Sequence, residues 1–304
     1  MQRNLLGKTG LNVSVLGFGG APASFLRTEA QQQAAVVNGL LDAGVNLIDT
    51  ATMYAGHEEF IGEHLAHRRG DFVLVSKVGG KHKDVEGAPF SDQNITNAID
   101  RALRLMKTDH VDVMLLHSCD LATLEADDAL ASLVRARDAG KIRFAGYSGD
   151  GEAAAFACRL PDVAVLECSL SFADQRNIDE VLPLAKAHNV GVIAKRPIAN
   201  ACWKDLPSQP GFYKNYAKTY TDRLAKMGLT PADVGMTDAQ WPELALRFTI
   251  GIEGVATAIV GTTDPDHVKA NLGFAEKGPL PAEAIATIRQ KFDAAADESW
   301  TGQT

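Results

Sequence analysis

The chain has 304 residues, 46% hydrophobic and 22% charged, a composition that excludes disordered and collagen-like classes and is typical of a globular protein with a large core. Its formal net charge of -8 argues against a nucleic-acid partner or an anionic membrane surface, because both bind clustered lysines and arginines. No apolar run approaches the roughly 20 residues that span a bilayer, the first ten residues lack the apolar core of a signal peptide, and the four cysteines form no CxxC pair, so we expect a cytoplasmic protein with reduced thiols.

Short apolar runs alternate with longer helical patterns along most of the chain, which predicts repeated strand-helix units and a parallel sheet. Eight strands are predicted: Val15 to Gly19, Leu47 to Asp49, Phe72 to Ser76, Val111 to Leu116, Ile142 to Tyr147, Val163 to Cys168, Val190 to Lys195 and Ala256 to Val260. The helical patterns between them include Glu29 to Ala43, Asp92 to Met106, Asp127 to Ala139 and Ile178 to His188. The regular alternation favours a closed (β/α)8 TIM barrel in one domain, residues 1–304, over an open doubly wound sheet.

Two segments depart from this alternation. Leu5 to Val13 precedes the first barrel strand and contains two glycines, so we expect a hairpin that plugs the amino-terminal end of the barrel. The stretch from Pro197 to Gln240, after the seventh strand, is longer than an ordinary connection and ends in a helix predicted over Tyr216 to Met227. Its aromatic residues either wall a ligand pocket or form a surface cluster of their own: Trp203, Phe212, Tyr213, Tyr216 and Tyr220.

The segment Gly44 to Gly56 (GVNLIDTATMYAG) carries the first functional signal. Asp49 and Tyr54 lie five positions apart, directly after the short apolar run that predicts the second barrel strand. In parallel α/β folds, ligands and chemistry collect at the carboxyl ends of strands. A carboxylate and a phenol are therefore expected side by side at the mouth of the barrel.

Lys77 and His117 follow the third and fourth strands, so they are expected in the same sector of the mouth. A neighbouring ammonium lowers the pKa of a phenol, and a carboxylate holds that ammonium in place. Tyr54 would then move a proton, while His117 orients the substrate oxygen, as the reduction of a carbonyl requires. Taken singly, each residue also has a structural interpretation, such as a helix cap for Asp49 or core packing for Tyr54.

The chain resembles the aldo-keto reductases in six segments: LGFGG (16–20), GVNLIDTATMYAG (44–56), LVSKVGG (74–80), DHVDVMLLHSCD (109–120), GKIRFAGYSG (140–149) and IVGTTDPDHVKANL (259–272). This resemblance implies a (β/α)8 barrel with a nicotinamide cofactor extended across the carboxyl ends of the strands. It also implies a catalytic tetrad, which is formed here by Asp49, Tyr54, Lys77 and His117. In that tetrad Tyr54 is the general acid in reduction and the general base in oxidation.

The resemblance also implies cofactor contacts, and there the chain departs from the family pattern. Gly19, Gly20 and Asp49 would lie close to the nicotinamide, and Ser148 would hydrogen-bond its carboxamide. Where the family commonly has Asn, Gln and a stacking aromatic residue, this chain has Gly149, Glu167 and Lys195, and Lys195 is followed by Arg196. We hypothesise that Glu167 accepts the carboxamide NH2, while Lys195 covers the ring and pairs with Glu167.

The segment after the eighth strand matches the part of the family that binds the adenosine end of the cofactor. The resemblance assigns these contacts to Gly261, Thr262, Thr263, His267 and Asn271. Gly261 and His267 stand where the family often has Lys and Arg, and Asp264 would repel a 2′-phosphate unless it serves as a helix N-cap. NADP(H) is favoured by the resemblance, and NAD(H) is possible.

The favoured function is an NAD(P)(H)-dependent oxidoreductase that acts on an aldehyde, a ketone or a sugar hydroxyl, with a small molecule as its partner. The altered residues around the nicotinamide keep one alternative open, a non-catalytic nicotinamide-binding sensor or regulatory subunit. A lyase or isomerase that uses Lys77 as a Schiff base is a third hypothesis. We expect no metal, because alternate residues of one strand face opposite ways and the histidines at 110 and 117 are separated accordingly.

Overall fold

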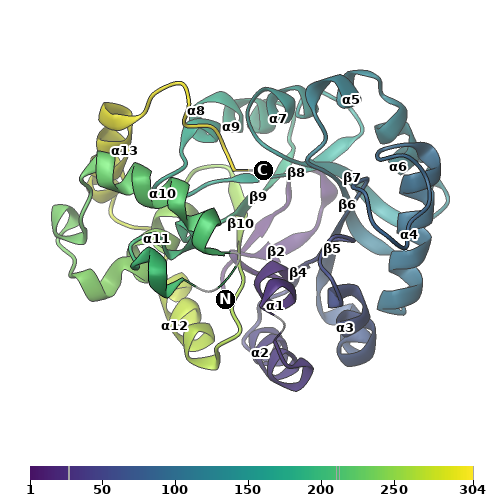
Figure 1. Ribbon diagram of the computed structural model, residues 1–304, viewed down its shortest axis with the longest axis horizontal. Coiled ribbons are helices and arrows are strands. Elements are labelled where there is room, and N and C mark those ends of the chain that lie inside the picture. Colours follow the sequence, from purple (N-terminus) through teal and green to yellow (C-terminus); the bar gives the residue numbers. More distant parts are fainter. Residues whose placement is uncertain (27, 210, 212, 304) are drawn as a thin grey trace.

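The computed structural model describes residues 1–26, 28–209, 211 and 213–303. A closed barrel of eight parallel strands lies at its centre, with neighbours in the order β10-β3-β4-β5-β6-β7-β8-β9 (Figure 1). The strands are β3 (Leu16–Gly19), β4 (Leu47–Asp49), β5 (Val73–Val78), β6 (Val111–His117), β7 (Ile142–Ser148), β8 (Val163–Ser169), β9 (Gly191–Lys195) and β10 (Val255–Val260). The predicted barrel is confirmed, every predicted strand is present to within two residues at each end, and the open-sheet alternative is wrong.

Helices surround the strands and supply the outer half of the core (Figure 1). They are α1 (Ala21–Phe25), α2 (Ala30–Asp42), α3 (His57–His64), α4 (Asp92–Met106), α5 (Leu121–Glu125), α6 (Asp128–Asp138), α7 (Gly151–Ala157), α8 (Arg176–Glu180), α9 (Leu182–Ala187), α10 (Tyr213–Met227), α11 (Trp241–Ile250), α12 (Pro265–Glu276) and α13 (Ala282–Ala295). One helix predicted over Ile178 to His188 is two, because Pro183 lacks a backbone N–H and starts the new helix α9 in its first turn. Within the described ranges, no helix has the length and apolar character needed to cross a membrane.

The barrel interior follows the period-two geometry of its strands. Side chains alternate between the two faces of a strand, so every second residue points inward. A separate inner cluster of buried apolar residues fills the barrel and includes Leu47, Val75, Leu115, Val165 and Ile193. The residue two positions further along each of these strands therefore also points inward, one layer closer to the carboxyl end.

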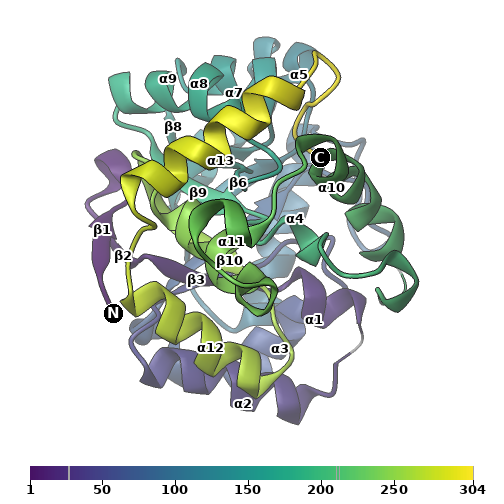
Figure 2. The ribbon, with the colours of Figure 1, turned by 90° about the vertical axis from the view of Figure 1, so that its left-hand side faces the viewer.

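A small hairpin closes the opposite end, as predicted. Its strands β1 (Arg3–Leu5) and β2 (Asn12–Ser14) pair antiparallel, and Figure 2 shows them on the side of the molecule away from α1 and α10. Leu6 is fully buried between the two strands of the hairpin and belongs to the inner cluster. At Gly191 a Cβ would lie 2.6 Å from the backbone carbon of Leu6, so only glycine lets the hairpin seat against β9.

Candidate active site

Five polar side chains form one inward layer at the mouth of the barrel. Each lies two residues beyond an apolar member of the inner cluster, at the carboxyl end of β4, β5, β6, β8 and β9. The strand geometry therefore brings together Asp49, Lys77, His117, Glu167 and Lys195. The prediction that consecutive strand ends share one sector of the mouth is confirmed for the first three of these residues.

Lys77 lies at the centre of this layer with only 1% of its surface exposed. Its ammonium donates to a carboxylate oxygen of Asp49, donates to the Thr50 carbonyl at 3.1 Å, and forms an ion pair with Oε2 of Glu167 at 3.3 Å. Burial alone lowers the pKa of Lys77, but the two carboxylates outweigh burial and raise this pKa above its ordinary value. Lys77 is therefore a permanent cation held between two acids.

Tyr54 is positioned by a loop that is tied to β5 rather than free to move. Thr50 N–H donates to the Val75 carbonyl at 2.8 Å, and Thr52 N–H donates to the Lys77 carbonyl at 3.0 Å. The next turn closes with a bond of 2.9 Å from Tyr54 N–H to the Ala51 carbonyl. As a result, the Lys77 ammonium lies 5.2 Å from the centre of the Tyr54 ring.

His117 completes the group on the other side of Tyr54. The two rings meet edge to face, with centroids 6.2 Å apart and an interplanar angle of 85°. Burial lowers the pKa of His117 to about 3, and the cations Lys77, Lys195 and Arg196 act in the same direction. The imidazole is therefore neutral at physiological pH and can donate a hydrogen bond without carrying charge.

The pKa of Tyr54 differs from the expectation. Removal from water raises the pKa of the phenol above its ordinary value, and the Asp49 and Glu167 carboxylates add to this rise. Lys77 and Arg196 oppose the rise without cancelling it. The expected lowering by Lys77 is present, but burial outweighs it, so Tyr54 holds its proton firmly.

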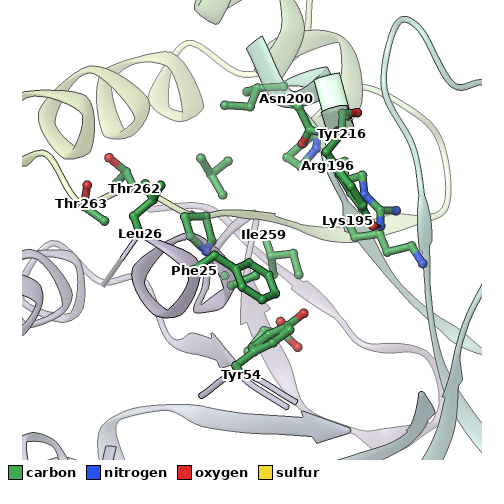
Figure 3. Close-up of a pocket in the computed structure, with 18 of the residues that line it drawn as sticks. Phe25, Leu26, Tyr54, Lys195, Arg196, Asn200, Tyr216, Ile259, Thr262 and Thr263 are labelled. Atoms are coloured by element: carbon green, nitrogen blue, oxygen red, sulfur yellow. Dashed lines mark hydrogen bonds between the residues drawn. The ribbon is translucent and has the colours of Figure 1, made fainter. Parts of the chain in front are cut away.

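A cavity of about 620 Å³ opens above this layer and extends between α1 and the loop that follows β10 (Figure 3). The cavity wall includes most of the residues predicted to contact a cofactor: Gly19, Asp49, Ser148, Glu167, Lys195, Arg196, Gly261, Thr262, Thr263 and His267. Tyr54 and His117 also line it. Lys77 lies beneath the wall and acts on the cavity through its neighbours.

Two predicted contact residues do not line the cavity. A Cβ on Gly20 would lie 2.2 Å from the ring of His57, so the missing side chain makes room for that buried histidine. Asn271 is 8% exposed within α12 and lies outside the cavity wall. Gly261, by contrast, lets the chain approach α1, because a Cβ there would lie 2.2 Å from Pro22.

Asp264 is a helix cap, one of the two roles considered for it. Its side chain accepts a bond of 2.9 Å from Asp266 N–H, and α12 begins directly after it. His267 lies in the first turn, with its Nδ1 3.5 Å from Thr262 Oγ1 and its Nε2 3.9 Å from Asp264 Oδ2. This end of the cavity thus offers a helix N-terminus, hydroxyl groups and an imidazole.

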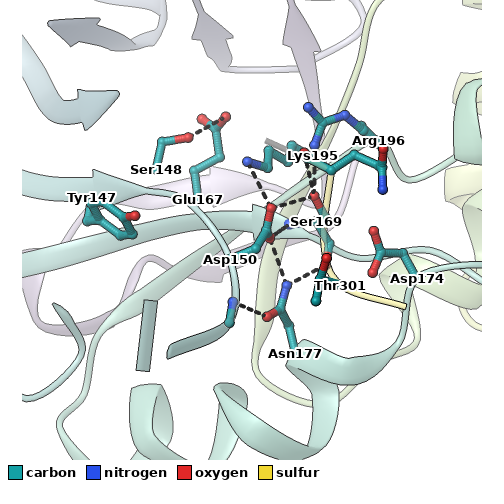
Figure 4. A network of polar contacts seen from close by, with 12 residues as sticks. Tyr147, Ser148, Asp150, Glu167, Ser169, Asp174, Asn177, Lys195, Arg196 and Thr301 are labelled. Carbon is teal, nitrogen blue, oxygen red and sulfur yellow. Dashed lines mark hydrogen bonds and ion pairs between the residues drawn. The ribbon is translucent and has the colours of Figure 1, made fainter. Parts of the chain in front are cut away.

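The predicted ion pair between Lys195 and Glu167 is wrong. Lys195 Nζ pairs with Asp150 Oδ2 at 3.3 Å (Figure 4), whereas Glu167 pairs with Lys77. The reason is competition: Asp150, in the loop after β7, is the nearer acid to Lys195 and is itself buried. Glu167 receives a further weak bond of 3.4 Å from Ser148 Oγ, and its Oε2 accepts no hydrogen bond from the residues that the structure describes.

Asp150 is a site residue that the sequence reasoning missed. Its carboxylate accepts bonds from Ser169 N–H at 2.6 Å, Ser169 Oγ at 3.0 Å and Asn177 Nδ2 at 2.8 Å, in addition to the ion pair with Lys195 (Figure 4). Burial raises the pKa of Asp150, but Lys195 and these donors outweigh burial and lower the pKa below its ordinary value. A signal was available, since Asp150 follows a barrel strand directly after the small residue Gly149.

Arg196 forms the edge of the cavity in a backbone conformation that arginine seldom adopts, with φ at 58°. Its guanidinium donates to Ser169 Oγ at 2.7 Å and to Tyr216 Oη at 2.5 Å, and its Cζ lies 5.0 Å from the centre of the Tyr216 ring. These contacts hold the positive φ in place. The result is a fixed second cation next to Lys195.

Gly149 has a steric reason that the sequence pattern did not show. A Cβ there would lie 2.3 Å from Oη of Tyr147, whose ring is buried and whose hydroxyl donates to the Cys119 carbonyl at 2.7 Å. An asparagine, which the family commonly has at this position, would therefore collide with Tyr147. The side chain of Tyr147 occupies the space that the asparagine would need.

Of the aromatic residues after β9, one lines the cavity and others pack in a separate cluster, so both predicted alternatives occur. Tyr216 lines the cavity, whereas Trp203 stacks on Trp241 with centroids 5.7 Å apart and packs near Phe172 in a separate cluster. Tyr220 is buried and donates to Asp174 at 2.9 Å. Pro210 and Phe212 lie outside the described residues, as does the side chain of Tyr213. The helix predicted from Tyr216 begins earlier, at the start of α10.

Apolar side chains frame the outer rim of the cavity. Phe25, at the end of α1, meets Tyr54 edge to face at 5.9 Å, and Leu26 and Met53 also line the wall. Phe90 packs over Gly79 instead and does not belong to this wall. Among the residues that the structure describes, no three His, Cys, Asp or Glu side chains are grouped as metal ligands would be.

Comparison with known proteins identifies the family. The model of the "Aldo/keto reductase family" matches residues 15–293. The chain belongs to the aldo/keto reductase family. A solved structure, aldo-keto reductase AKR11C1 from Bacillus halodurans in its holo form, superposes with a TM-score of 0.82 over 99% of both chains at 27% sequence identity.

Curated relatives of this aldo-keto reductase carry different names. The chain is 27% identical to the L-galactose dehydrogenase of Arabidopsis thaliana, over 97% of this chain and 95% of that protein. It is 29% identical to a probable voltage-gated potassium channel subunit beta of the same plant, over 92% of this chain and 93% of that protein. The family and its oxidoreductase members identify this aldo-keto reductase as an NAD(P)-dependent oxidoreductase.

Proposed function

We propose that this protein transfers hydride between a nicotinamide cofactor and an aldehyde, a ketone or a sugar hydroxyl, with Tyr54 as the general acid and base. The observation that carries the proposal is the position of the Tyr54 phenol between Lys77 and the neutral imidazole of His117, at the floor of an open cavity. The cofactor supplies the hydride, and the protein supplies the proton.

In reduction, a carbonyl oxygen enters beside Tyr54 and accepts a hydrogen bond from the neutral His117. The phenol proton then moves to the oxygen as negative charge develops there. The resulting phenolate is stabilised by the ammonium of Lys77, which Asp49 and Glu167 keep protonated. The high pKa of Tyr54 before reaction suits a group that releases its proton only when that charge appears.

The cavity fits a nicotinamide in two respects. Glu167 Oε2 is buried and accepts no hydrogen bond from the described residues, and Ser148 Oγ lies next to the same side chain. A carboxamide NH2 would satisfy this acceptor. We therefore assign the carboxamide to Ser148 and Glu167, and the cover of the ring to Lys195, which Asp150 holds in place.

Membership of the family supports NADP(H) as the first candidate, with the phosphates at Thr262, Thr263 and the start of α12. NAD(H) is the alternative, because Gly261 and His267 stand where the family often has Lys and Arg, so two permanent charges that would bind a 2′-phosphate are missing there. Parallel titrations with NADPH and NADH decide between them. The cofactor with the lower dissociation constant, in its oxidised and reduced forms, is used in the experiments below.

Replacing Tyr54 by Phe tests the proposal. Removing one hydroxyl removes the proton donor and leaves the cavity wall intact, so turnover should fall by about 10²–10⁴-fold, while the dissociation constant of the cofactor should change less than about threefold. Turnover is followed through the cofactor absorbance with a panel of aldehydes and of sugars. Normal turnover by Tyr54→Phe would sink the assignment.

A second function, nicotinamide binding without useful turnover, is supported by one relative that carries the name of a channel subunit. The same assay separates the two functions. Repeated turnover of any carbonyl or sugar by the unmodified protein supports the oxidoreductase. Tight cofactor binding without turnover across the panel supports the sensor.

The Schiff-base hypothesis for Lys77 receives no support from the geometry. The ammonium is 1% exposed, lies beneath the cavity wall and is held protonated by two carboxylates. A Schiff base requires a neutral amine with access to the substrate. Lys77 meets neither condition.

A further inference from the structure

Glu167 differs from Asp150 in how little of its hydrogen-bonding capacity is used. Asp150 accepts three hydrogen bonds and an ion pair. Glu167 is 2% exposed, and among the described residues its carboxylate meets Lys77 at 3.3 Å, Ser148 at 3.4 Å and the side chain of Asp49, whose pKa is raised by burial and by Glu167. Glu167 therefore lines the cavity with a buried carboxylate whose Oε2 accepts no hydrogen bond from the described residues.

The positive and negative charges of the side chains in and directly behind this part of the wall are equal in number. Lys195 and Arg196 carry positive charge, and Asp150 and Glu167 carry negative charge. Beneath them, Lys77 and Asp49 form an ion pair of their own, in which burial and the neighbouring Glu167 raise the pKa of Asp49. Figure 4 shows Glu167 and Lys195 on neighbouring strands with their charged ends at the same edge. Changing either one of them leaves the wall with an unbalanced unit charge.

An unbalanced charge matters here because the site is buried and poorly screened. The nicotinamide ring is cationic when oxidised and neutral when reduced, and the carboxamide is the same in both forms. A nearby charge therefore changes the relative affinity of the two forms, whereas a hydrogen bond to the carboxamide affects both alike. The two effects of Glu167 can thus be separated.

We propose that the Glu167 carboxylate shifts the binding preference of this cavity toward the oxidised, cationic nicotinamide, and that the Lys195 ammonium shifts it the opposite way. The inference rests on the proposed function, since it requires the nicotinamide to lie beside Ser148 and Glu167. It assigns to these two residues the redox selectivity of cofactor binding. In the direction of carbonyl reduction, Glu167 thereby favours the hydride-donating step, because that step creates the cationic ring.

The experiment measures dissociation constants of the oxidised and reduced cofactor by calorimetry for four proteins: unmodified, Glu167→Gln, Lys195→Gln and the double variant. Gln has nearly the shape of Glu and can still accept a hydrogen bond, so the change is mainly one of charge. The quantity compared is the ratio of the oxidised to the reduced dissociation constant. We expect this ratio to rise about tenfold in Glu167→Gln and to fall about tenfold in Lys195→Gln.

The double variant restores the charge balance, so its ratio should return to within about threefold of the unmodified value. Glu243→Gln is the matched control, because Glu243 is a buried glutamate paired with Arg247 and Lys277, both at 2.8 Å, outside the cavity wall. It should leave the ratio unchanged. Circular dichroism and thermal melting verify that each variant is folded.

Equal weakening of both redox forms in Glu167→Gln, with an unchanged ratio, would overturn the inference and leave Glu167 as a hydrogen-bond acceptor only. A ratio that moves in the same direction in both single variants would also overturn it. Failure of the unmodified protein to bind either redox form would contradict the proposed function itself. Binding of both forms with an unchanged ratio contradicts the inference alone.

Discussion

At the scale of single residues, His57 has the clearest effect on how the stability of the protein depends on pH. It is 2% exposed, its Nδ1 lies 2.8 Å from Thr50 Oγ1, and its Nε2 has no partner among the described residues. Burial lowers its pKa to about 3, and Lys77 adds to this effect. The ordinary pKa of histidine is about 6.5. Between pH 3 and pH 6.5, His57 is therefore protonated in the unfolded chain and neutral in the folded chain.

The lowered pKa of His57 fixes the sign of the pH dependence. The stabilising contribution is complete above the unfolded pKa and is lost as the pH falls from 6.5 toward 3. His57→Gln should reduce the slope of unfolding free energy against pH by up to about 1.4 kcal/mol per pH unit in that window. Urea unfolding at a series of pH values measures it, with His188→Gln at an exposed histidine as the control. Identical slopes for His57→Gln and the unmodified protein would contradict the assignment.

The residue types at the site and the ion pair between Asp49 and Lys77 could be predicted, whereas the partners of Lys195 and Glu167 could not. Period-two alternation and the strand ends placed Asp49, Lys77 and His117 correctly, because a strand determines which side chains share a layer. The partner of Lys195 depends on side-chain rotamers within a layer that holds several acids and cations. Sequence spacing does not order such neighbours, so Asp150 escaped notice and Glu167 received the wrong partner.

At the scale of elements, the network around Asp150 joins parts of the chain that the barrel alone does not connect. Asn177, in α8, donates to Asp150 at 2.8 Å and to the Ser169 carbonyl at 2.9 Å, and it accepts a bond of 3.1 Å from Gly151 N–H. The loop after β7 is thereby linked to β8 and α8, and the ion pair of Asp150 with Lys195 extends the network to β9. The chain near its C-terminus packs on the same network, since a Cβ on Gly302 would lie 2.3 Å from Asp150.

Asn177→Ala should destabilise the protein by about 2–4 kcal/mol, because it leaves a buried carboxylate, a carbonyl and an N–H short of partners. It should also weaken cofactor binding, since Asp150 no longer holds Lys195 firmly. Urea unfolding and cofactor titration measure the two effects. Asn97→Ala, which removes one bond of 3.4 Å near the surface, should cost less than about 0.5 kcal/mol. Equal losses for the two variants would show that the network is not structural.

At the scale of the whole molecule, the hairpin and the candidate active site lie at opposite ends of the barrel. The hairpin of β1 and β2 lies at one end of the barrel (Figure 2) and closes it through Leu6, and the cavity opens at the other end. This division follows from the alternation of strands and helices, and it was the part of the fold most fully predictable, because it depends on pattern over the whole chain. The break between α8 and α9 was less predictable, since one proline decided it.

Leu6→Ala should therefore cost about 2–5 kcal/mol of unfolding free energy by leaving a void under the barrel, while turnover per folded molecule stays unchanged. The neighbouring Leu5→Ala is a matched control, because Leu5 is 62% exposed and Leu6 is fully buried. It should change stability by less than about 0.5 kcal/mol. Thermal melting and the turnover assay test both statements, and a loss of turnover in folded Leu6→Ala would argue that the two ends are coupled.

The contact between Gly149 and Tyr147 also restricts the evolutionary routes open to this chain. An asparagine introduced at position 149 meets the Tyr147 ring before it can reach any ligand. Tyr147 would have to become smaller first, which would open a void beside Cys119. The order of substitutions is thus constrained: an asparagine at position 149 fits this packing only after Tyr147 has changed.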